Sequence, residues 1–138
     1  MTRADSLWKA LVHAVWETRD DWRQRVVAAT KLPFGRVRAL WRLAERPMAL
    51  RDLAKSMSVD APAATVTVDD LEERGLVQRT PHPTNGRMKL VALTAAGKRM
   101  VARIEAVPDE PPPAFSALPA ADREVVQRII DAIIPRHE

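Results

Sequence analysis

The sequence predicts a mainly α-helical fold with one small β-hairpin, and three observations carry that prediction. Apolar residues recur every three or four positions over six separate stretches, which is the spacing of amphipathic helices. Two short strand-like runs, 76–80 and 88–93, flank the pair Asn85-Gly86, which is a strong hairpin signal. Pro33 and Gly75 stand where a helix is expected to begin and to end.

Length and composition indicate one folded domain. The chain has 138 residues, of which 46% are hydrophobic and 29% charged, as in ordinary globular proteins. It contains no cysteine, which excludes disulfides and thiolate chemistry. No apolar run approaches the roughly 20 residues that a membrane helix needs, and the first residues lack the pattern of a secretion signal. We therefore expect a cytoplasmic protein with no membrane segment.

A long first helix is predicted over 4–29, with three tryptophans on its apolar stripe. Packing of this stripe against the rest of the chain, or against a second copy, is favoured over a platform for stacking bases, because base-stacking aromatics usually lie in a positively charged groove. The stripe comprises Trp8, Leu11, Val12, Val15, Trp16, Arg19, Trp22 and Val26.

Five further helices are predicted, and the last of them is strongly apolar. Prolines at 108 and 111–113 interrupt the helical structure before it, and this segment forms either a rigid corner or a polyproline ligand. The last helix has too wide an apolar face for a free surface helix, and pairing with the first helix of another copy would cover it. The five helices are expected at 33–46, 50–57, 61–74, 95–107 and 119–134.

The segment Leu50–Leu93 has the order of a winged helix-turn-helix. A short helix leads through the turn Ser58-Val59-Asp60 into a second helix, and the hairpin follows. The small Ala54 stands where the two helices would cross, and Ser58 occupies a turn position that usually holds glycine. Such units place their second helix in the DNA major groove while the first crosses the backbone. The hairpin would be the wing.

Two phrases, MALRDLAKSMSVDAPAATVTVDDLEERGLVQRT and PTNGRMKLVALTAAGKRM, resemble the core of a MarR-family regulator. The strongest local matches are 71–77 and 93–97, and the order of elements fits the family over nearly the whole chain. The resemblance implies one protomer over 1–138, with a winged lobe at 31–93 and dimerisation helices within 1–30 and 94–138. It also implies a homodimer on a pseudo-palindromic DNA operator, released by a small aromatic or phenolic acid.

The resemblance assigns candidate contacts to double-stranded DNA on three elements. The candidate DNA contacts are Arg51 and Lys55 on the first helix of the motif, Thr65, Val66 and Thr67 on the second, and Arg87 and Lys89 on the wing.

A ligand pocket is expected beside the first helix, where Trp16, Trp22 or Trp41 could line it. A purely structural role in the core is the alternative for each tryptophan.

Charge on the second helix of the motif argues against tight DNA binding. Residues 57–80 hold five acidic and two basic residues, and Asp69, Asp70 and Glu73 are expected on the outward face. Acids there would oppose the neutralisation of phosphates. His82 and Asn85 also stand where family members commonly have acids that brace the wing arginine. The alternative is therefore a degenerate winged-helix dimer with weak or no sequence-specific DNA binding, which acts through a small molecule or a protein partner.

Nothing in the sequence nominates an enzyme. The three histidines, at 13, 82 and 137, are scattered along the chain. There is no clustered set of metal ligands and no glycine-rich phosphate loop. We expect no catalytic residue, no metal site and no cofactor.

Overall fold

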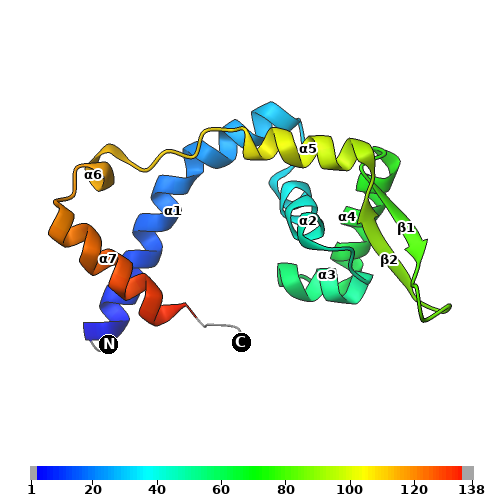
Figure 1. The fold of residues 1–138 in the computed structure, drawn as a ribbon, viewed down its shortest axis with the longest axis horizontal. Coiled ribbons are helices and arrows are strands. Elements are labelled where there is room, and N and C mark those ends of the chain that lie inside the picture. Colours follow the sequence, from blue (N-terminus) through cyan, green and yellow to red (C-terminus); the bar gives the residue numbers. More distant parts are fainter. Residues whose placement is uncertain (1–2, 135–138) are drawn as a thin grey trace. The chain divides into compact units, whose positions relative to one another are not determined.

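The computed structural model describes residues 3–134, which fall into two compact units divided between Pro108 and Asp109 (Figure 1). The first unit holds five helices and a hairpin, and the second holds two helices. The elements are α1 (Arg3–Thr30), α2 (Phe34–Glu45), α3 (Leu50–Met57), α4 (Ala61–Glu73), β1 (Val77–Pro81), β2 (Lys89–Leu93), α5 (Ala95–Glu105), α6 (Pro113–Ser116) and α7 (Ala120–Ile133).

The predicted fold class is confirmed, and each predicted element lies within a few residues of its expected place. One short helix, α6, was not predicted, because it is a single turn of four residues among prolines that interrupt helices. Pro113 is the first residue of α6, where the amide hydrogen that proline lacks would have no partner within the helix. In the part of the chain that the structure describes, no helix is long and apolar enough to cross a membrane.

Helix α2 lies at the centre of the first unit. It packs against α1, α3, α4, α5 and β2, and its Val37 and Leu40 are fully buried. The core around it is built from aliphatic side chains of every neighbouring element. Its largest fully buried members are Val26, Leu32, Leu53, Val68, Leu71, Val77, Val91 and Ile104.

Three helices end at a residue in the left-handed region, which breaks the helical path sharply. These residues are Lys31 after α1, Ser58 after α3 and Gly75 after α4, with φ values of 59°, 55° and 75°. Ser58 thus makes the turn of the helix-turn-helix, although a side chain there is less favourable than glycine. Asp60 then begins α4, because its Oδ1 accepts a hydrogen bond from the Ala63 amide at 2.8 Å.

The hairpin is a two-stranded antiparallel sheet that is tied back to the helical lobe. Val77 pairs with Leu93 at its base and Pro81 with Lys89 at its tip. Met48 forms a bridge to Val91, with N–O distances of 3.1 and 2.7 Å. At the tip, Nδ1 of His82 accepts the amides of Thr84 and Asn85, both at 3.1 Å.

The two segments with the strongest family resemblance meet where the hairpin joins α4 and α5. The Thr94 hydroxyl donates to the Gly75 carbonyl at 2.6 Å, and it accepts the Gly97 amide that it caps at 3.0 Å. Gly97 lies so close to the backbone of Leu76 that a Cβ atom there would collide with the Leu76 carbonyl. Residues 71–77 and 93–97 are therefore one packed corner that fixes the direction in which the hairpin leaves α4.

Two helices keep their apolar faces exposed. The first half of α1 exposes Leu7, Trp8, Leu11, Val15 and Trp16, whereas Trp22 and Val26 of its second half are buried. No residue of α7 is buried, and Ile129 and Ile133 are about half exposed. The apolar stripes predicted for these two helices are therefore only partly covered within one chain.

Candidate nucleic-acid interface and adjoining cavity

The helix-turn-helix and the hairpin form one contiguous part of the first unit (Figure 1). Helix α3 packs on α4, and α4 packs on β1. On α4, Val66 is 59% exposed. Thr65 is half-buried, and its hydroxyl donates to the Ala61 carbonyl at 3.0 Å, so its oxygen keeps capacity to accept a hydrogen bond.

Thr67 does not lie on this exposed face, which corrects its expected place among the DNA-reading residues. Its side chain is only 7% exposed. The reason is helical spacing: α4 buries Ala64, Thr67, Val68 and Leu71, which follow the three- and four-residue period of one helix face. The same period was visible in the sequence, since Ala64 and Leu71 were both expected to point inward.

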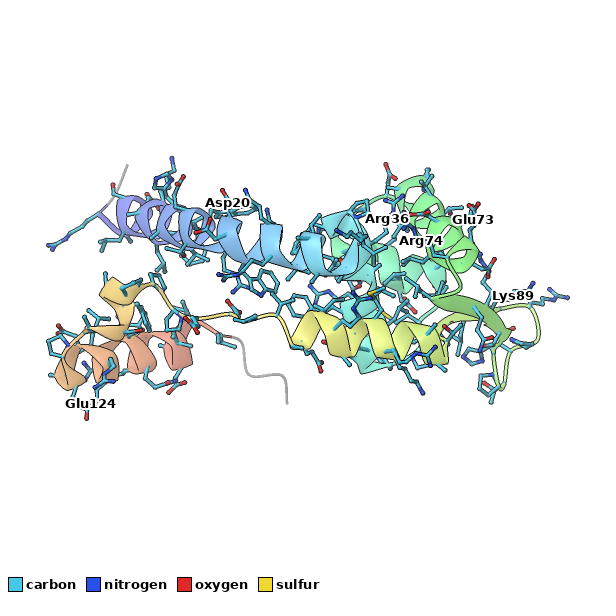
Figure 2. All side chains as sticks on the ribbon, turned by 90° about the horizontal axis from the view of Figure 1, so that it is seen from above. Asp20, Arg36, Glu73, Arg74, Lys89 and Glu124 are labelled. Carbon is cyan, nitrogen blue, oxygen red and sulfur yellow. The ribbon has the colours of Figure 1, made fainter. Side chains whose placement is uncertain are left out.

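The four basic candidates are exposed on two of these elements. Arg51 and Lys55 lie on α3, and Arg87 and Lys89 lie in the hairpin, where Figure 2 labels Lys89. Within residues 3–134, none of the four makes an ion pair with a carboxylate. Their charges are therefore available to an anionic partner.

The acids of α4, in contrast, are mostly held by arginines. Asp70 accepts from Nε of Arg36 on α2 at 2.9 Å and from Nε of Arg74 at 3.1 Å. Figure 2 shows Arg36 and Arg74 beside each other, as their shared partner requires. Both hydrogen bonds favour the charged carboxylate, so the Arg36 bond first and the Arg74 bond second lower the pKa of Asp70 below its ordinary value.

A second cluster joins α4 to the hairpin. Arg79 on β1 donates from Nη2 to Asp69 at 2.7 Å and from Nη1 to Glu72 at 3.0 Å. The Arg79 amide also donates to the Glu72 carboxylate at 3.3 Å. One guanidinium thus spans two acids of α4 and holds the hairpin against that helix.

Asp69 and Glu73 are exposed as expected, so the acids of α4 stay on the surface, and the ion pairs offset part of their negative charge. Asp69, Asp70 and Glu72 each face a guanidinium, and only Glu73 of the four has no ion pair among the described residues. A count of charges along residues 57–80 could not find this, because Arg36 lies outside that stretch and its distance to Asp70 is set by packing.

The three candidate ligand-binding tryptophans meet at one cavity of about 830 Å³. It lies among α1, α2 and Glu105 of α5. Trp22 is also part of the core, stacked on Trp41 with 5.3 Å between ring centroids and edge-on to Phe34 at 5.8 Å. Trp16 is 57% exposed. The lining residues are Val15, Trp16, Arg19, Trp22, Arg23, Phe34, Arg38, Trp41, Arg42, Ala44, Glu45 and Glu105.

Four arginines of this cavity were missed by sequence reasoning. The Arg19 guanidinium lies 3.9 Å from the Trp22 ring centroid, and that of Arg23 lies 5.1 Å from the Trp16 centroid and 4.6 Å from the Phe34 centroid. Arg38 and Arg42 come from α2. The sequence did carry a signal for two of these arginines, because Arg19 and Arg23 lie three and seven residues after Trp16, on the same face of the helix.

Among residues 3–134, no group of three His, Cys, Asp or Glu could hold a metal ion.

Comparison with known proteins identifies the winged lobe. Residues 35–89 match the MarR family model. Apo MarR from Escherichia coli has a TM-score of 0.76 at 22% identity, over 92% of this chain and 96% of that one. CouR from Rhodococcus jostii RHA1, bound to p-coumaroyl-CoA, has a TM-score of 0.68 at 25% identity, over 100% and 99% of the two chains. A MarR-family transcriptional regulator from Rhodococcus sp. RHA1 has a TM-score of 0.67 at 25% identity, over 96% and 95%. The resemblance expected from the sequence is therefore confirmed: residues 35–89 match the MarR family, and the chain has the winged-helix fold of these solved structures.

Proposed function

We propose that this protein is a cytoplasmic transcriptional regulator that binds double-stranded DNA as a homodimer, and that it has no enzymatic activity. One observation carries the proposal: α3 and the hairpin present Arg51, Lys55, Arg87 and Lys89 without carboxylate partners among the described residues, whereas most acids of α4 are held by arginines. Lysine and arginine supply most of the electrostatic affinity for phosphates. The exposed positive charges of α3 and the hairpin, together with the paired acids of α4, favour DNA over a cationic partner.

In the proposed complex, α4 enters the major groove, and the hairpin reaches the adjacent groove or backbone. Thr65 keeps acceptor capacity for a base edge, and the exposed Val66 offers methyl contact to thymine. Arg51, Lys55, Arg87 and Lys89 contact phosphates. With so few base-reading side chains, recognition depends strongly on phosphate contacts and on DNA shape.

The homodimer is proposed because two apolar helix faces need a cover. Trp8 and Leu11 on α1, and Ile129 and Ile133 on α7, are exposed in the single chain. Apolar surface of this extent on a water-soluble protein usually marks an interface. Dimerisation through residues 1–30 and 94–138 would bring two winged lobes to the two halves of a pseudo-palindromic operator.

The cavity is the proposed site for an effector of the aromatic acid class. Trp16, Trp41 and Phe34 offer ring faces, and Arg38 offers a planar guanidinium for a carboxylate. CouR, a relative of the same fold, binds p-coumaroyl-CoA, which carries an aromatic ring and anionic phosphates. A bound aromatic acid would release the protein from its operator.

A charge-matched pair of variants tests the DNA-binding face. Arg87→Gln with Lys89→Gln removes two exposed charges from the hairpin, and Lys98→Gln with Arg99→Gln removes two exposed charges from α5. The first pair should reduce the slope of log affinity against log salt by roughly 3.6 per bound dimer, because each phosphate contact contributes about 0.9 and the homodimer loses two contacts on each protomer. The second pair should leave the slope unchanged. Equal slopes for both pairs would contradict the proposed face.

A second candidate, a winged-helix dimer without sequence-specific DNA binding, is favoured by one observation. Thr67 is buried and Val66 exposed, so Thr65 alone of the three α4 candidates can hydrogen-bond to a base. Such a protein would act through a small molecule or a protein partner. It predicts that affinity is the same for every DNA sequence and is lost in moderate salt.

A further inference from the structure

Arg38 belongs both to the cavity and to the helix-turn-helix. It lies on α2, is half-buried and lines the cavity beside Trp41. Its Nη2 also donates a hydrogen bond to the carbonyl of Met57 at 2.9 Å. Met57 is the last residue of α3, and the next residue, Ser58, makes the left-handed turn into α4. One side chain therefore connects the cavity to this turn.

This hydrogen bond stabilises the end of a helix. The last carbonyls of an α-helix have no partner within the helix, and a nearby cation satisfies them and interacts favourably with the helix dipole. A hydrogen bond from a charged donor is about twice as strong as a neutral one. The turn that follows is short, with the Val59 amide bonded to the Ala54 carbonyl at 3.0 Å. The position of the α3 terminus therefore sets the direction of α4.

We propose that Arg38 is a positioning residue through which an anion in the cavity changes the geometry of the helix-turn-helix. A guanidinium is planar, and a carboxylate that binds it side-on fixes the orientation of that plane. An anion held in the cavity therefore draws Arg38 away from the Met57 carbonyl. The α3 terminus loses its cap, the turn loosens, and α4 no longer holds the orientation that fits DNA. The inference rests on the proposed function.

The other cavity arginines have different contacts. Arg19 and Arg23 come from α1, and their guanidinium groups lie over the rings of Trp22, Trp16 and Phe34. Arg42 lies one turn after Arg38 on the same helix and lines the same cavity, and within residues 3–134 it makes no hydrogen bond to α3 or α4. Arg42 is therefore a matched control for charge and location.

The first experiment needs no ligand. Hydrogen exchange at the Ser58 and Val59 amides is compared among wild type, Arg38→Gln and Arg42→Gln. Loss of one charge-assisted hydrogen bond should make exchange in Arg38→Gln about tenfold faster. Arg42→Gln should exchange like wild type. If Arg38→Gln fails to fold, Arg38→Lys takes its place. Lysine keeps the positive charge but lacks the planar guanidinium, so the exchange rate at the two amides should increase by less than the roughly tenfold expected for Arg38→Gln.

The second experiment uses 1-naphthoate and p-coumaroyl-CoA as probes. Quenching of tryptophan fluorescence reports binding in the cavity, and anisotropy of a labelled duplex reports DNA affinity at saturating probe. For wild type and Arg42→Gln, a probe should weaken DNA binding about tenfold, which is within the usual range of allosteric coupling. For Arg38→Gln, quenching should persist while the ratio of DNA affinities with and without probe falls close to one.

The outcomes separate the inference from the proposed function. A wild type that binds no DNA contradicts the proposed function itself. A wild type that binds DNA and responds to a probe, with Arg38→Gln responding equally, overturns the role of Arg38. So does unchanged exchange at Ser58 and Val59. If neither probe quenches fluorescence or releases DNA from wild type, the link between cavity and turn is also overturned, while DNA binding stands.

Discussion

Arg36 and Asp70 join the central helix to the proposed recognition helix through an ion pair with 2.9 Å between Nε and Oδ2. Both side chains are about three-quarters covered, at 24% and 28% exposed. Two residues further along α2, Arg38 holds the end of α3. Both helices of the helix-turn-helix are therefore attached to α2 by arginines, in addition to the apolar core between them.

Asp70→Asn should destabilise the winged lobe. The change removes the carboxylate that Arg36 and Arg74 share and leaves both guanidinium groups without their anionic partner. The urea midpoint of unfolding should fall. Glu73→Gln is the matched control, because Glu73 is exposed on the same helix and has no ion pair among the described residues. Equal midpoints for the two variants would show that Asp70 acts only as a surface charge.

The same pair predicts how stability depends on pH. The pKa of Asp70 is lowered in the folded state, chiefly by Arg36, so its contribution is complete above the usual aspartate pKa of about 3.9. It is lost as pH falls from there through the lowered folded value. The difference in urea midpoint between wild type and Asp70→Asn should therefore shrink as the pH is lowered from 5 toward 3. A difference that grows toward acid would contradict this assignment.

Gly97→Ala and Gly35→Ala should have opposite effects. At Gly97, a methyl group would collide with the Leu76 carbonyl, which is backbone and cannot move aside. We expect a loss of about 1–3 kcal/mol in the free energy of unfolding, as for an overpacked core. At Gly35 no atom lies within 4 Å of the added methyl, and alanine should stabilise α2 by up to about 1 kcal/mol. Thermal unfolding measures both changes in stability. A Gly97→Ala variant as stable as wild type would contradict the predicted collision with the Leu76 carbonyl.

Leu11→Glu should weaken self-association. Leu11 is 46% exposed on the apolar stripe of α1, where the proposed dimer needs an apolar contact. A carboxylate buried there without a partner is costly, and each 1.4 kcal/mol is about tenfold in the dissociation constant. Sedimentation equilibrium should show a dimer dissociation constant at least about tenfold larger than that of wild type. Gln24→Glu adds the same charge at an exposed polar position of α1 and should leave the dimer intact.

Local patterns predicted most of the fold because its elements are defined by short-range signals. Helical spacing located α1 to α5 and α7, and Asn85-Gly86 located the hairpin turn. The spacing of the motif predicted a turn at Ser58, although serine is not the usual residue there, and the structure shows that its backbone is left-handed. Only α6 was missed, because one helical turn has no measurable period.

The site was harder to predict because its electrostatics depend on contacts between distant elements. Asp70 was expected to oppose DNA, yet its partner Arg36 lies 34 residues earlier. The cavity arginines were not predicted as a group, since only packing of α1 on α2 shows that Arg23 and Arg38 line the same space. Thr67 could have been placed correctly, because the helical period that buries Leu71 also buries residue 67.

The most direct test of the account is binding of the purified protein to tiled DNA from upstream of its own gene. Fluorescence anisotropy at low and moderate salt would measure affinity for each tile. The account predicts tight binding to one tile that survives moderate salt, because specific contacts add to the salt-sensitive phosphate contacts. Weak binding to every tile, lost in moderate salt, would contradict it and would mean that the winged-helix fold is kept without a reading helix.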